Sequence, residues 1–216
     1  MDIVAPEIET YLSSLVTQPP VLERVATEGA ELGLPIIDST VGRLLETIVL
    51  ATKANQVLEI GTANGYSALW LAQSLPPDGR LISFEIEPSR AQLARSHLDK
   101  AGLGDRASVM VGDAALLVYK VAGPFDVIFN DGDKQQYPQL LDRLVTLLRP
   151  GGALVTDNIL WNGEVVPGAV MTPSRSADET KAIAAYNRQL AADSRLLTSF
   201  LPVRDGVAVS IRKPSP

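Results

Sequence analysis

Cysteine is absent from the 216-residue sequence, and histidine occurs once, as His97. The first absence excludes disulfides, thiolate zinc sites, iron–sulfur clusters and a cysteine nucleophile. The second excludes a three-histidine metal site, so any metal ion must bind to oxygen ligands. The charged neighbours of His97, namely Arg95, Asp99 and Lys100, indicate a solvated surface position, and we assign His97 no role.

Basic residues are also in short supply, because 19 Lys and Arg face 25 Asp and Glu, giving a formal net charge of −6. Such a chain is a poor general binder of the nucleic-acid backbone. No segment approaches the roughly 18 consecutive apolar residues of a membrane span, and the N-terminal segment is acidic where a signal peptide would be basic. We therefore expect a soluble cytoplasmic protein.

The spacing of apolar residues changes near residue 56. Before it, helical spacing predicts helices over 7–16, 20–32 and 39–52. After it, short β-rich segments alternate five times with amphipathic segments, which predicts an α/β fold with a parallel sheet and helices on both faces. A final pair of β-rich segments around 204–206 predicts an antiparallel hairpin at the sheet edge. We expect one domain, with a helical preface over 1–55 and an α/β core over 56–216.

Ligands of open parallel sheets bind beyond the carboxyl ends of the strands. The first predicted strand ends at Glu59 and continues into a turn with glycines at 61 and 65. Their G-x-x-x-G spacing differs from the G-x-G-x-x-G of dinucleotide sites. Glu85 follows the next strand, where a carboxylate either binds both ribose hydroxyls or is a surface acid. Asp113 follows the third strand, and it either caps the next helix or binds an adenine edge.

The next two strand ends carry a set of oxygen ligands. Asp131 follows the fourth strand, and Asp157 and Asn158 follow the fifth. Two carboxylates and an amide suit Mg²⁺, which prefers oxygen ligands and leaves positions for water or substrate. Lys134 lies three residues beyond Asp131. It either acts as a base, if burial and a nearby cation lower its pKa, or forms a surface salt bridge.

Several segments together resemble a known family. These are VLEIGTANGYSALWLA, FEIE, GDA, DGDKQQY, LRPGGALVTDN and ILWNGEVV. They resemble the cation-dependent S-adenosylmethionine O-methyltransferases, the group of caffeoyl-CoA and catechol O-methyltransferases, over about 35–212. The resemblance implies a class I methyltransferase (Rossmann-like) fold with a seven-stranded, mostly parallel sheet. It also implies a homodimer. Two departures are the apolar pair Ile36 and Ile37, where plant members carry a polar residue, and an N-terminal region without the basic residues that would bind coenzyme A.

The resemblance also implies roles for individual residues. Lys134 matches the base, and the residues that match the metal ligands are Asp131, Asp157 and Asn158. Asn162 matches a residue beside the acceptor, and Trp161 either lines the acceptor pocket or packs beneath its loop. The positions that match cofactor-binding residues are Glu59, Gly61, Thr62, Ser67, Glu85, Ala114, Asp131 and Asp133.

The sequence thus predicts an O-methyltransferase that uses S-adenosylmethionine and Mg²⁺, or Ca²⁺ or Mn²⁺ in its place. Its acceptor would be a small phenolic compound with two adjacent hydroxyls. Two alternatives remain open at this point. One is methylation of a hydroxylated uridine in tRNA, which the negative net charge disfavours. The other is a non-catalytic nucleoside-binding module, since fold alone does not establish activity. The identity of the acceptor cannot be predicted from the sequence.

Overall fold

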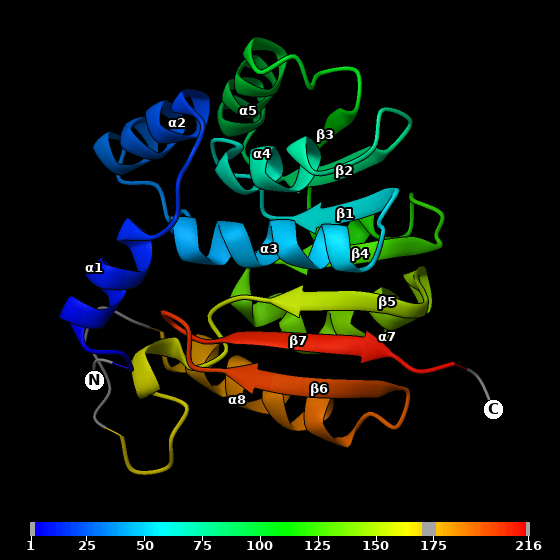
Figure 1. Cartoon of the computed structure of the whole chain (residues 1–216). Coiled ribbons are helices and arrows are strands. Elements are labelled where there is room, and N and C mark those ends of the chain that lie inside the picture. Colours follow the sequence, from blue (N-terminus) through cyan, green and yellow to red (C-terminus); the bar gives the residue numbers. More distant parts are fainter. Residues whose placement is uncertain (1–2, 170–175, 215–216) are drawn as a thin grey trace.

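A single seven-stranded sheet forms the centre of the computed structural model, which describes residues 3–169 and 176–214 (Figure 1). The strands lie in the order β3-β2-β1-β4-β5-β7-β6. The first five pair in parallel, while β7 pairs antiparallel with both β5 and β6. The strands are β1 (Gln56–Ile60), β2 (Arg80–Glu85), β3 (Ala107–Val111), β4 (Phe125–Asn130), β5 (Leu148–Thr156), β6 (Leu196–Leu201) and β7 (Val207–Arg212). The predicted fold class, including its antiparallel hairpin, is confirmed.

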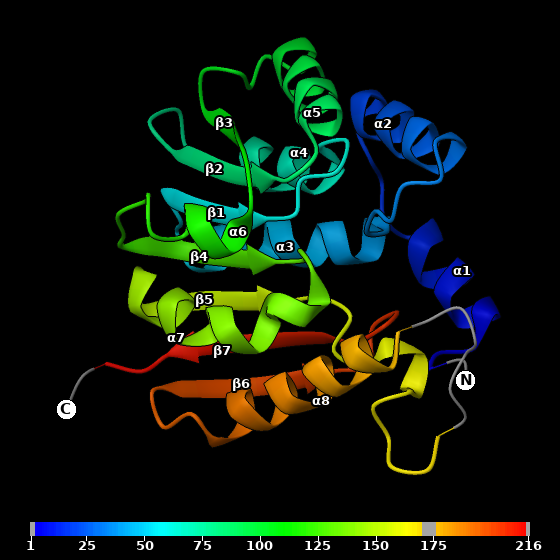
Figure 2. The ribbon, with the colours of Figure 1, turned by 180° about the vertical axis from the view of Figure 1, so that it is seen from behind.

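Helices cover both faces of the sheet, as Figures 1 and 2 show from opposite sides. On one side lie α2 (Pro20–Glu31), α3 (Ser39–Ala51), α4 (Tyr66–Gln73) and α5 (Pro88–Lys100). On the other lie α6 (Ala114–Leu117), α7 (Tyr137–Leu147) and α8 (Ala177–Ala192). The first helix, α1 (Pro6–Ser14), has no buried residue and lies beside the edge where the parallel strands end. Two short 3₁₀ helices, η1 (Lys134–Gln136) and η2 (Trp161–Gly163), follow β4 and β5.

Capping side chains fix where several helices begin. Asp38 accepts a hydrogen bond from the Val41 N–H at 2.9 Å and so caps α3. Asp113 does the same for α6 through the Ala115 N–H, also at 2.9 Å. These contacts satisfy backbone donors that a helix leaves without a partner in its first turn. They also anchor the segments that enter the edge where the strands end.

The predicted helical preface shares its core with the sheet. Leu22 and Val25 of α2 and Leu45 of α3 are at most 3% exposed, and they belong to the same apolar cluster as Val57 and Val127 of the central strands. Separate domains would each bury a core of their own. The preface and the sheet therefore bury one common apolar cluster, while the single domain with the bounds given above stays a prediction.

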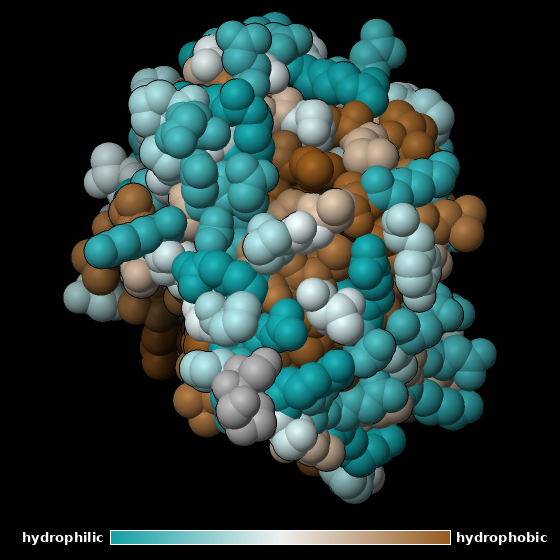
Figure 3. All heavy atoms as spheres, turned by 90° about the vertical axis from the view of Figure 1, so that its right-hand side faces the viewer, coloured by the Kyte–Doolittle hydropathy of each residue, from teal (hydrophilic) through white to brown (hydrophobic). Residues whose placement is uncertain are grey.

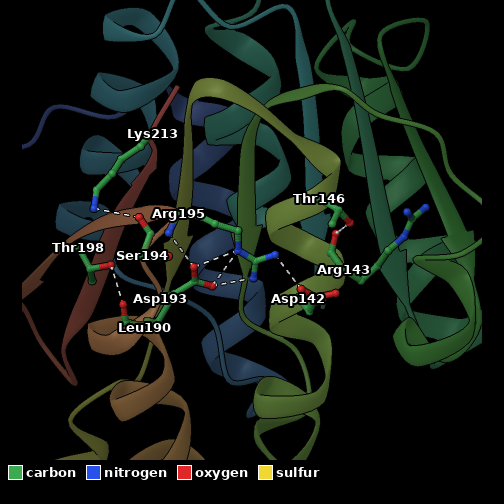
Figure 4. A network of polar contacts seen from close by, with 9 residues as sticks. All are labelled: Asp142, Arg143, Thr146, Leu190, Asp193, Ser194, Arg195, Thr198 and Lys213. Carbon is green, nitrogen blue, oxygen red and sulfur yellow. Dashed lines mark hydrogen bonds and ion pairs between the residues drawn. The ribbon is translucent and has the colours of Figure 1, made fainter. Parts of the chain in front are cut away.

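A polar network fastens the far end of α8 to its neighbours (Figure 4). The Arg195 guanidinium donates to Asp193 and to Asp142 of α7, with an Nη–Oδ distance of 2.7 Å in each pair. Arg195 lowers the pKa of the Asp193 carboxyl. Lys213 adds a bond from its Nζ to the Ser194 carbonyl at 3.0 Å. The network sets the position at which α8 gives way to β6.

Figure 3 shows the side of the molecule at the right of Figure 1, where the parallel strands begin. Hydrophilic residues surround a smaller hydrophobic area there. The predicted site residues follow the carboxyl ends of the strands and therefore belong to the opposite edge. Within residues 3–169 and 176–214, no helix is both long enough and apolar enough to cross a membrane.

Candidate active site

The carboxyl ends of β1, β2, β3, β4 and β5 open into one cavity of about 680 Å³. Its lining also includes Ile3 and Glu9 from the start of the chain, Ile36 before α3, and Arg204 from the hairpin. A cavity at this edge is where the topology of an open parallel sheet places a ligand. Of the predicted site residues, all except Glu59 line it.

The turn after β1 brings backbone close to the cavity. Gly61 has φ +94°, and a Cβ built on it would lie 2.5 Å from the carbonyl oxygen of Asp131. Any larger residue would therefore separate the tips of β1 and β4. The Thr62 hydroxyl donates to the Phe84 carbonyl at 3.0 Å, which ties the turn to β2. Thr62 and Ser67 both line the cavity.

Glu85 lies at the tip of β2 and is 5% exposed. Its Oε2 accepts from the Ala63 N–H at 2.8 Å, and its Oε1 accepts from the Glu87 N–H at 3.0 Å. These bonds hold the carboxylate in place and leave each oxygen a further lone pair for a ligand. Glu85 is thus a fixed acid in the cavity wall and not a solvated surface acid.

Glu59 lies behind the turn and is completely buried. Burial is the main cause that raises the pKa of its carboxyl to about 7, against the lowering effect of hydrogen bonds from Ser67 and Ser83. Because Ser67 lines the cavity and Glu59 does not, Glu59 reaches the ligand space only through other residues. The sequence placed it in direct contact with the cofactor, and the cavity lining does not include it.

The tip of β3 supplies the far wall of the cavity. Asp113 caps α6 as described, and the same Oδ1 accepts from the Gln136 side-chain amide at 3.0 Å. Asp113, Ala114 and the exposed side chain of Ile86 line the cavity together. Of the two roles that the sequence left open for Asp113, capping is observed.

Acidic and amide side chains meet at the tips of β4 and β5. Lys134 Nζ donates to Asp131 Oδ1 at 2.7 Å, with both side chains at most 15% exposed. Asp157 is 3% exposed, and burial followed by the nearby charge of Asp131 raises its pKa to about 7. Its Oδ1 accepts from the N–H of Asn158 at 2.8 Å. Asp131, Asp157 and Asn158 all line the cavity, so the predicted convergence of these side chains is observed.

The donors at these two tips fit a hard divalent cation. In the described ranges, no group of three or more His, Asp or Glu side chains is arranged to hold a metal ion. The set here has two carboxylates and one amide, so an ion would need further oxygens from water or a ligand, as Mg²⁺ usually does. A cation would also offset the repulsion between Asp131 and Asp157, which disfavours their joint ionisation without it.

The opposite end of the cavity is formed by segments far apart in sequence. Trp161 and Asn162 of η2 both have positive φ, +47° and +52°, and both line the cavity. The Asn162 N–H donates to the Asp205 carboxylate. Arg204 donates from Nη1 to the Ile36 carbonyl at 3.2 Å, across 168 positions of sequence. Trp161 thus lines the pocket. The long irregular segment over 159–176, expected from the sequence to cover the acceptor cleft, lies outside the described residues over 170–175.

The expectation for His97 is wrong. The residue is only 7% exposed, and both of its ring nitrogens have partners. Nδ1 lies 2.8 Å from the Asn64 carbonyl oxygen, and Nε2 lies 2.9 Å from Glu28 Oε2. Its charged neighbours in sequence, Arg95, Asp99 and Lys100, are exposed on other faces of α5. Their charge therefore did not indicate whether His97 itself is buried.

Other cavity residues were not singled out from the sequence. Arg90, Gln136, Glu179, Arg204 and Asp205 line the cavity. Arg204 and Asp205 belong to the predicted hairpin turn. A turn explains these residue types by itself, so the sequence did not indicate that they line the cavity. Glu179 lies in the first turn of α8, where an acid is also expected from the helix dipole alone.

Comparisons with known proteins identify the class of protein to which this sheet and its cavity belong. The model of the family described as O-methyltransferase matches residues 13–213. The chain belongs to this family, and the protein is an S-adenosylmethionine-dependent O-methyltransferase.

Individual relatives agree with this assignment. A catechol O-methyltransferase of Niastella koreensis is 32% identical over 218 residues, covering 95% of this chain and 96% of that one. Caffeoyl-CoA O-methyltransferase 1 of Eucalyptus globulus is 33% identical over 177 residues, covering 79% of this chain and 72% of that one. The structure of an O-methyltransferase from Bacillus cereus in complex with SAH has a TM-score of 0.85 and 30% identity, covering 96% of this chain and 97% of that one.

Proposed function

We propose that this methyltransferase requires a divalent cation and methylates one hydroxyl of a small catechol-type acceptor. The observation that carries the proposal is the placement of Asp131, Asp157, Asn158 and Lys134 in the same cavity as the turn after β1. The turn would hold the methyl donor, and the acid cluster would hold the acceptor hydroxyls. One cavity then brings the donor and the acceptor together, which is where much of the acceleration of a transfer without covalent catalysis arises.

The cofactor would lie along the strand tips. The Glu85 carboxylate would accept hydrogen bonds from both ribose hydroxyls, using the lone pairs that its backbone partners leave free. Ala114 would lie beside the adenine. Asp131 and Asp133 would face the positive sulfonium end, while Gly61 and Thr62 let the methionine part approach the backbone. Glu59 would act through Ser67 rather than by contact.

Asp131, Asp157 and Asn158 would hold the cation. Mg²⁺, or Ca²⁺ or Mn²⁺ in its place, would lower the pKa of a bound acceptor hydroxyl and stabilise its oxyanion. Lys134 Nζ is the basic group nearest to these ligands, because it bonds to Asp131 Oδ1. Lys134 would take the hydroxyl proton as general base, and the oxyanion would attack the methyl carbon in line, breaking its bond to the sulfonium sulfur and releasing SAH.

The charges of the cavity favour an acceptor without phosphate groups. Eight acidic side chains line it against three basic ones, Arg90, Lys134 and Arg204; the acidic ones are Glu9, Glu85, Asp113, Asp131, Asp133, Asp157, Glu179 and Asp205. Such a lining repels the phosphates of coenzyme A and of nucleic acid. This supports a small phenolic acceptor over a caffeoyl-CoA type acceptor or tRNA. Trp161 and Asn162 would contact its ring and its hydroxyls.

We also propose a homodimer in the cytoplasm. Apolar side chains on α1 and directly after it are exposed, among them Tyr11 and Leu15 at 62% each, and so is Leu197 on the edge strand β6 at 66%. A second copy of the chain would cover such side chains in a dimer. Sedimentation at micromolar concentration tests the dimer, and a monomer there would refute it. Cell fractionation tests the location.

Transfer of a tritiated methyl group from S-adenosylmethionine to a panel of acceptors tests the main proposal. Catechol should be methylated with Mg²⁺ and not after EDTA treatment, while caffeoyl-CoA and bulk tRNA should be poor acceptors. The Asp157→Asn variant should lose at least 100-fold in turnover with its affinity for SAH kept, and Asp78→Asn, on an exposed turn, serves as the matched control. Undiminished activity after EDTA would refute the role of the cation.

A further inference from the structure

A closed set of polar contacts, two of them hydrogen bonds, lies behind the turn after β1, outside the cavity. Asn64 is completely buried within this turn. Its side-chain amide donates to the Val25 carbonyl of α2 at 2.8 Å, and its own carbonyl lies 2.8 Å from His97 Nδ1 of α5. Glu28, one turn beyond Val25 on α2, completes the set with its carboxylate 2.9 Å from His97 Nε2. Three segments are therefore joined through one imidazole ring.

The turn needs such support because its backbone is unusual. Ala63 has φ +48°, a conformation that residues with a side chain adopt only when their surroundings impose it. Gly65 follows with φ +90°, and a Cβ built there would lie 3.1 Å from Ala94 of α5. On the cavity side, the turn is held to β2 by the bond from the Ala63 N–H to Glu85 and by the bond from the Thr62 hydroxyl to the Phe84 carbonyl. The opposite side has Asn64 and its two partners.

His97 contacts the turn through a main-chain atom. An imidazole that donates Nδ1–H to the Asn64 carbonyl fixes the peptide plane between Asn64 and Gly65, directly before α4 begins at Tyr66. Glu28 lies on the other side of the ring, and its carboxylate forms an ion pair with Nε2 when the imidazole is protonated. Because the ring is nearly buried, losing it would leave the carbonyl without this partner and allow the peptide to rotate.

We propose that His97 is a positioning residue for the cofactor. Together with Glu28, it holds the Asn64 carbonyl, and so keeps the cavity side of the turn, from Gly61 to Ala63, in the conformation that binds S-adenosylmethionine. The consequence is that α2, part of the helical preface, contributes to cofactor affinity although no residue of α2 lines the cavity. The inference rests on the proposed cofactor position.

Calorimetric titration with SAH tests the proposal in the full chain. His97→Leu removes both ring contacts and should weaken SAH binding five- to tenfold. His97→Asn should restore affinity to within about twofold of the wild type, because its amide can donate from the position of Nδ1. Turnover at saturating S-adenosylmethionine should stay within twofold for both variants, whereas KM for the cofactor should follow the affinity.

Two further variants separate positioning from stability. Leu98→Val, at the next position of α5 and 1% exposed, lowers stability without touching the turn, so it should leave SAH affinity unchanged. Glu28→Gln, whose side chain is 39% exposed, should fold normally and weaken binding two- to fivefold. That effect should vanish in a His97→Leu background, since the two residues act on the turn through the same contact.

Other results would overturn the inference. Wild-type affinity in His97→Leu, no restoration by His97→Asn, or an equal loss in Leu98→Val would each show that His97 only stabilises the fold. A wild-type protein that binds SAH while its Glu85→Ala variant binds equally well would instead refute the proposed cofactor position. The two failures are therefore distinguishable.

Discussion

The buried carboxyl group of Glu59 makes the stability of this protein depend on pH in a direction opposite to that of most acids. Its pKa is raised from 4.5 to about 7 in the folded chain, chiefly by burial. Between these two values the folded state binds a proton that the unfolded state has released. The free energy of unfolding therefore falls as pH rises through this window, because protons favour the state that binds them. Stability from this group is complete below pH 4.5 and is lost towards pH 7.

The size of the effect follows from the two pKa values. The difference from 4.5 to about 7 corresponds to roughly 3 kcal/mol, most of which falls between about pH 5 and pH 8. No discount for solvent screening applies, since Glu59 has no exposed surface. The Glu59→Gln substitution removes the titration, and its amide oxygen can still accept the hydrogen bond that Ser83 donates.

Urea unfolding followed by circular dichroism, repeated across this pH range, measures the effect. We expect the stability of Glu59→Gln relative to the wild type to rise by about 2 to 3 kcal/mol from pH 5 to pH 8. Asp157, whose pKa is also raised to about 7, titrates in both proteins and cancels in the comparison. Parallel pH profiles for the two proteins would refute the reasoning, since they would show that Glu59 does not take up a proton on folding.

Three further predictions concern the site. Glu85→Ala should weaken SAH binding by about 1.5 to 3 kcal/mol, the usual loss for hydrogen bonds to a charged group, and calorimetry should show no change for the exposed neighbour in Glu87→Ala. Lys134→Met should lower kcat by roughly 10²- to 10⁴-fold, as expected for loss of a general base. Equal SAH affinity in the variant and the wild type would show that the loss is not a binding defect. A near-normal kcat would show that Lys134 is not the base. Removing residues 1–14 should raise KM for the acceptor severalfold and leave SAH affinity within twofold, because residues before α2 line the cavity but do not hold the turn; normal acceptor kinetics would make the segment a structural appendage.

The fold was predictable from the sequence because its periodicities are local. The change near Gln56 from helical to alternating strand and helix patterns marks the start of β1, and the helices expected over 20–32 and 39–52 match α2 and α3 to within one residue. The helix expected over 7–16 runs beyond α1, which ends at Ser14. Periodicity indicates which face of a segment is apolar, and it does not fix the residue at which a helix ends.

Site residues that directly follow a strand end could be predicted from the sequence. Contacts between residues of distant segments could not. Asp131 and Asp157 could be paired because neighbouring parallel strands end at the same edge. His97 and Asn64, 33 positions apart, carry no shared pattern, and Arg204 meets Ile36 across 168 positions. Tertiary packing alone creates such contacts, so only the folded structure reveals them.

Backbone conformation supplies the remaining part of the site, and the sequence gives little sign of it. Within residues 3–169 and 176–214, six residues other than glycine have positive φ, and all but Lys53 line the cavity: Ala63, Asn158, Trp161, Asn162 and Arg204. Backbone strain of this kind persists only where the surroundings fix it.

Acidic side chains provide that fixation at three of these positions, each accepting a hydrogen bond from a strained N–H: Glu85 from Ala63, Asp157 from Asn158 and Asp205 from Asn162. Two of these acids are also the proposed ligands of ribose and of the cation. An acid in this cavity therefore has two tasks, to bind a ligand and to hold the backbone beside it. Changing Glu85 or Asp157 to an amide therefore weakens both the ligand contact and the hydrogen bond to the backbone. Changing Asp205 to an amide weakens the bond to the Asn162 N–H, and so affects the backbone of η2.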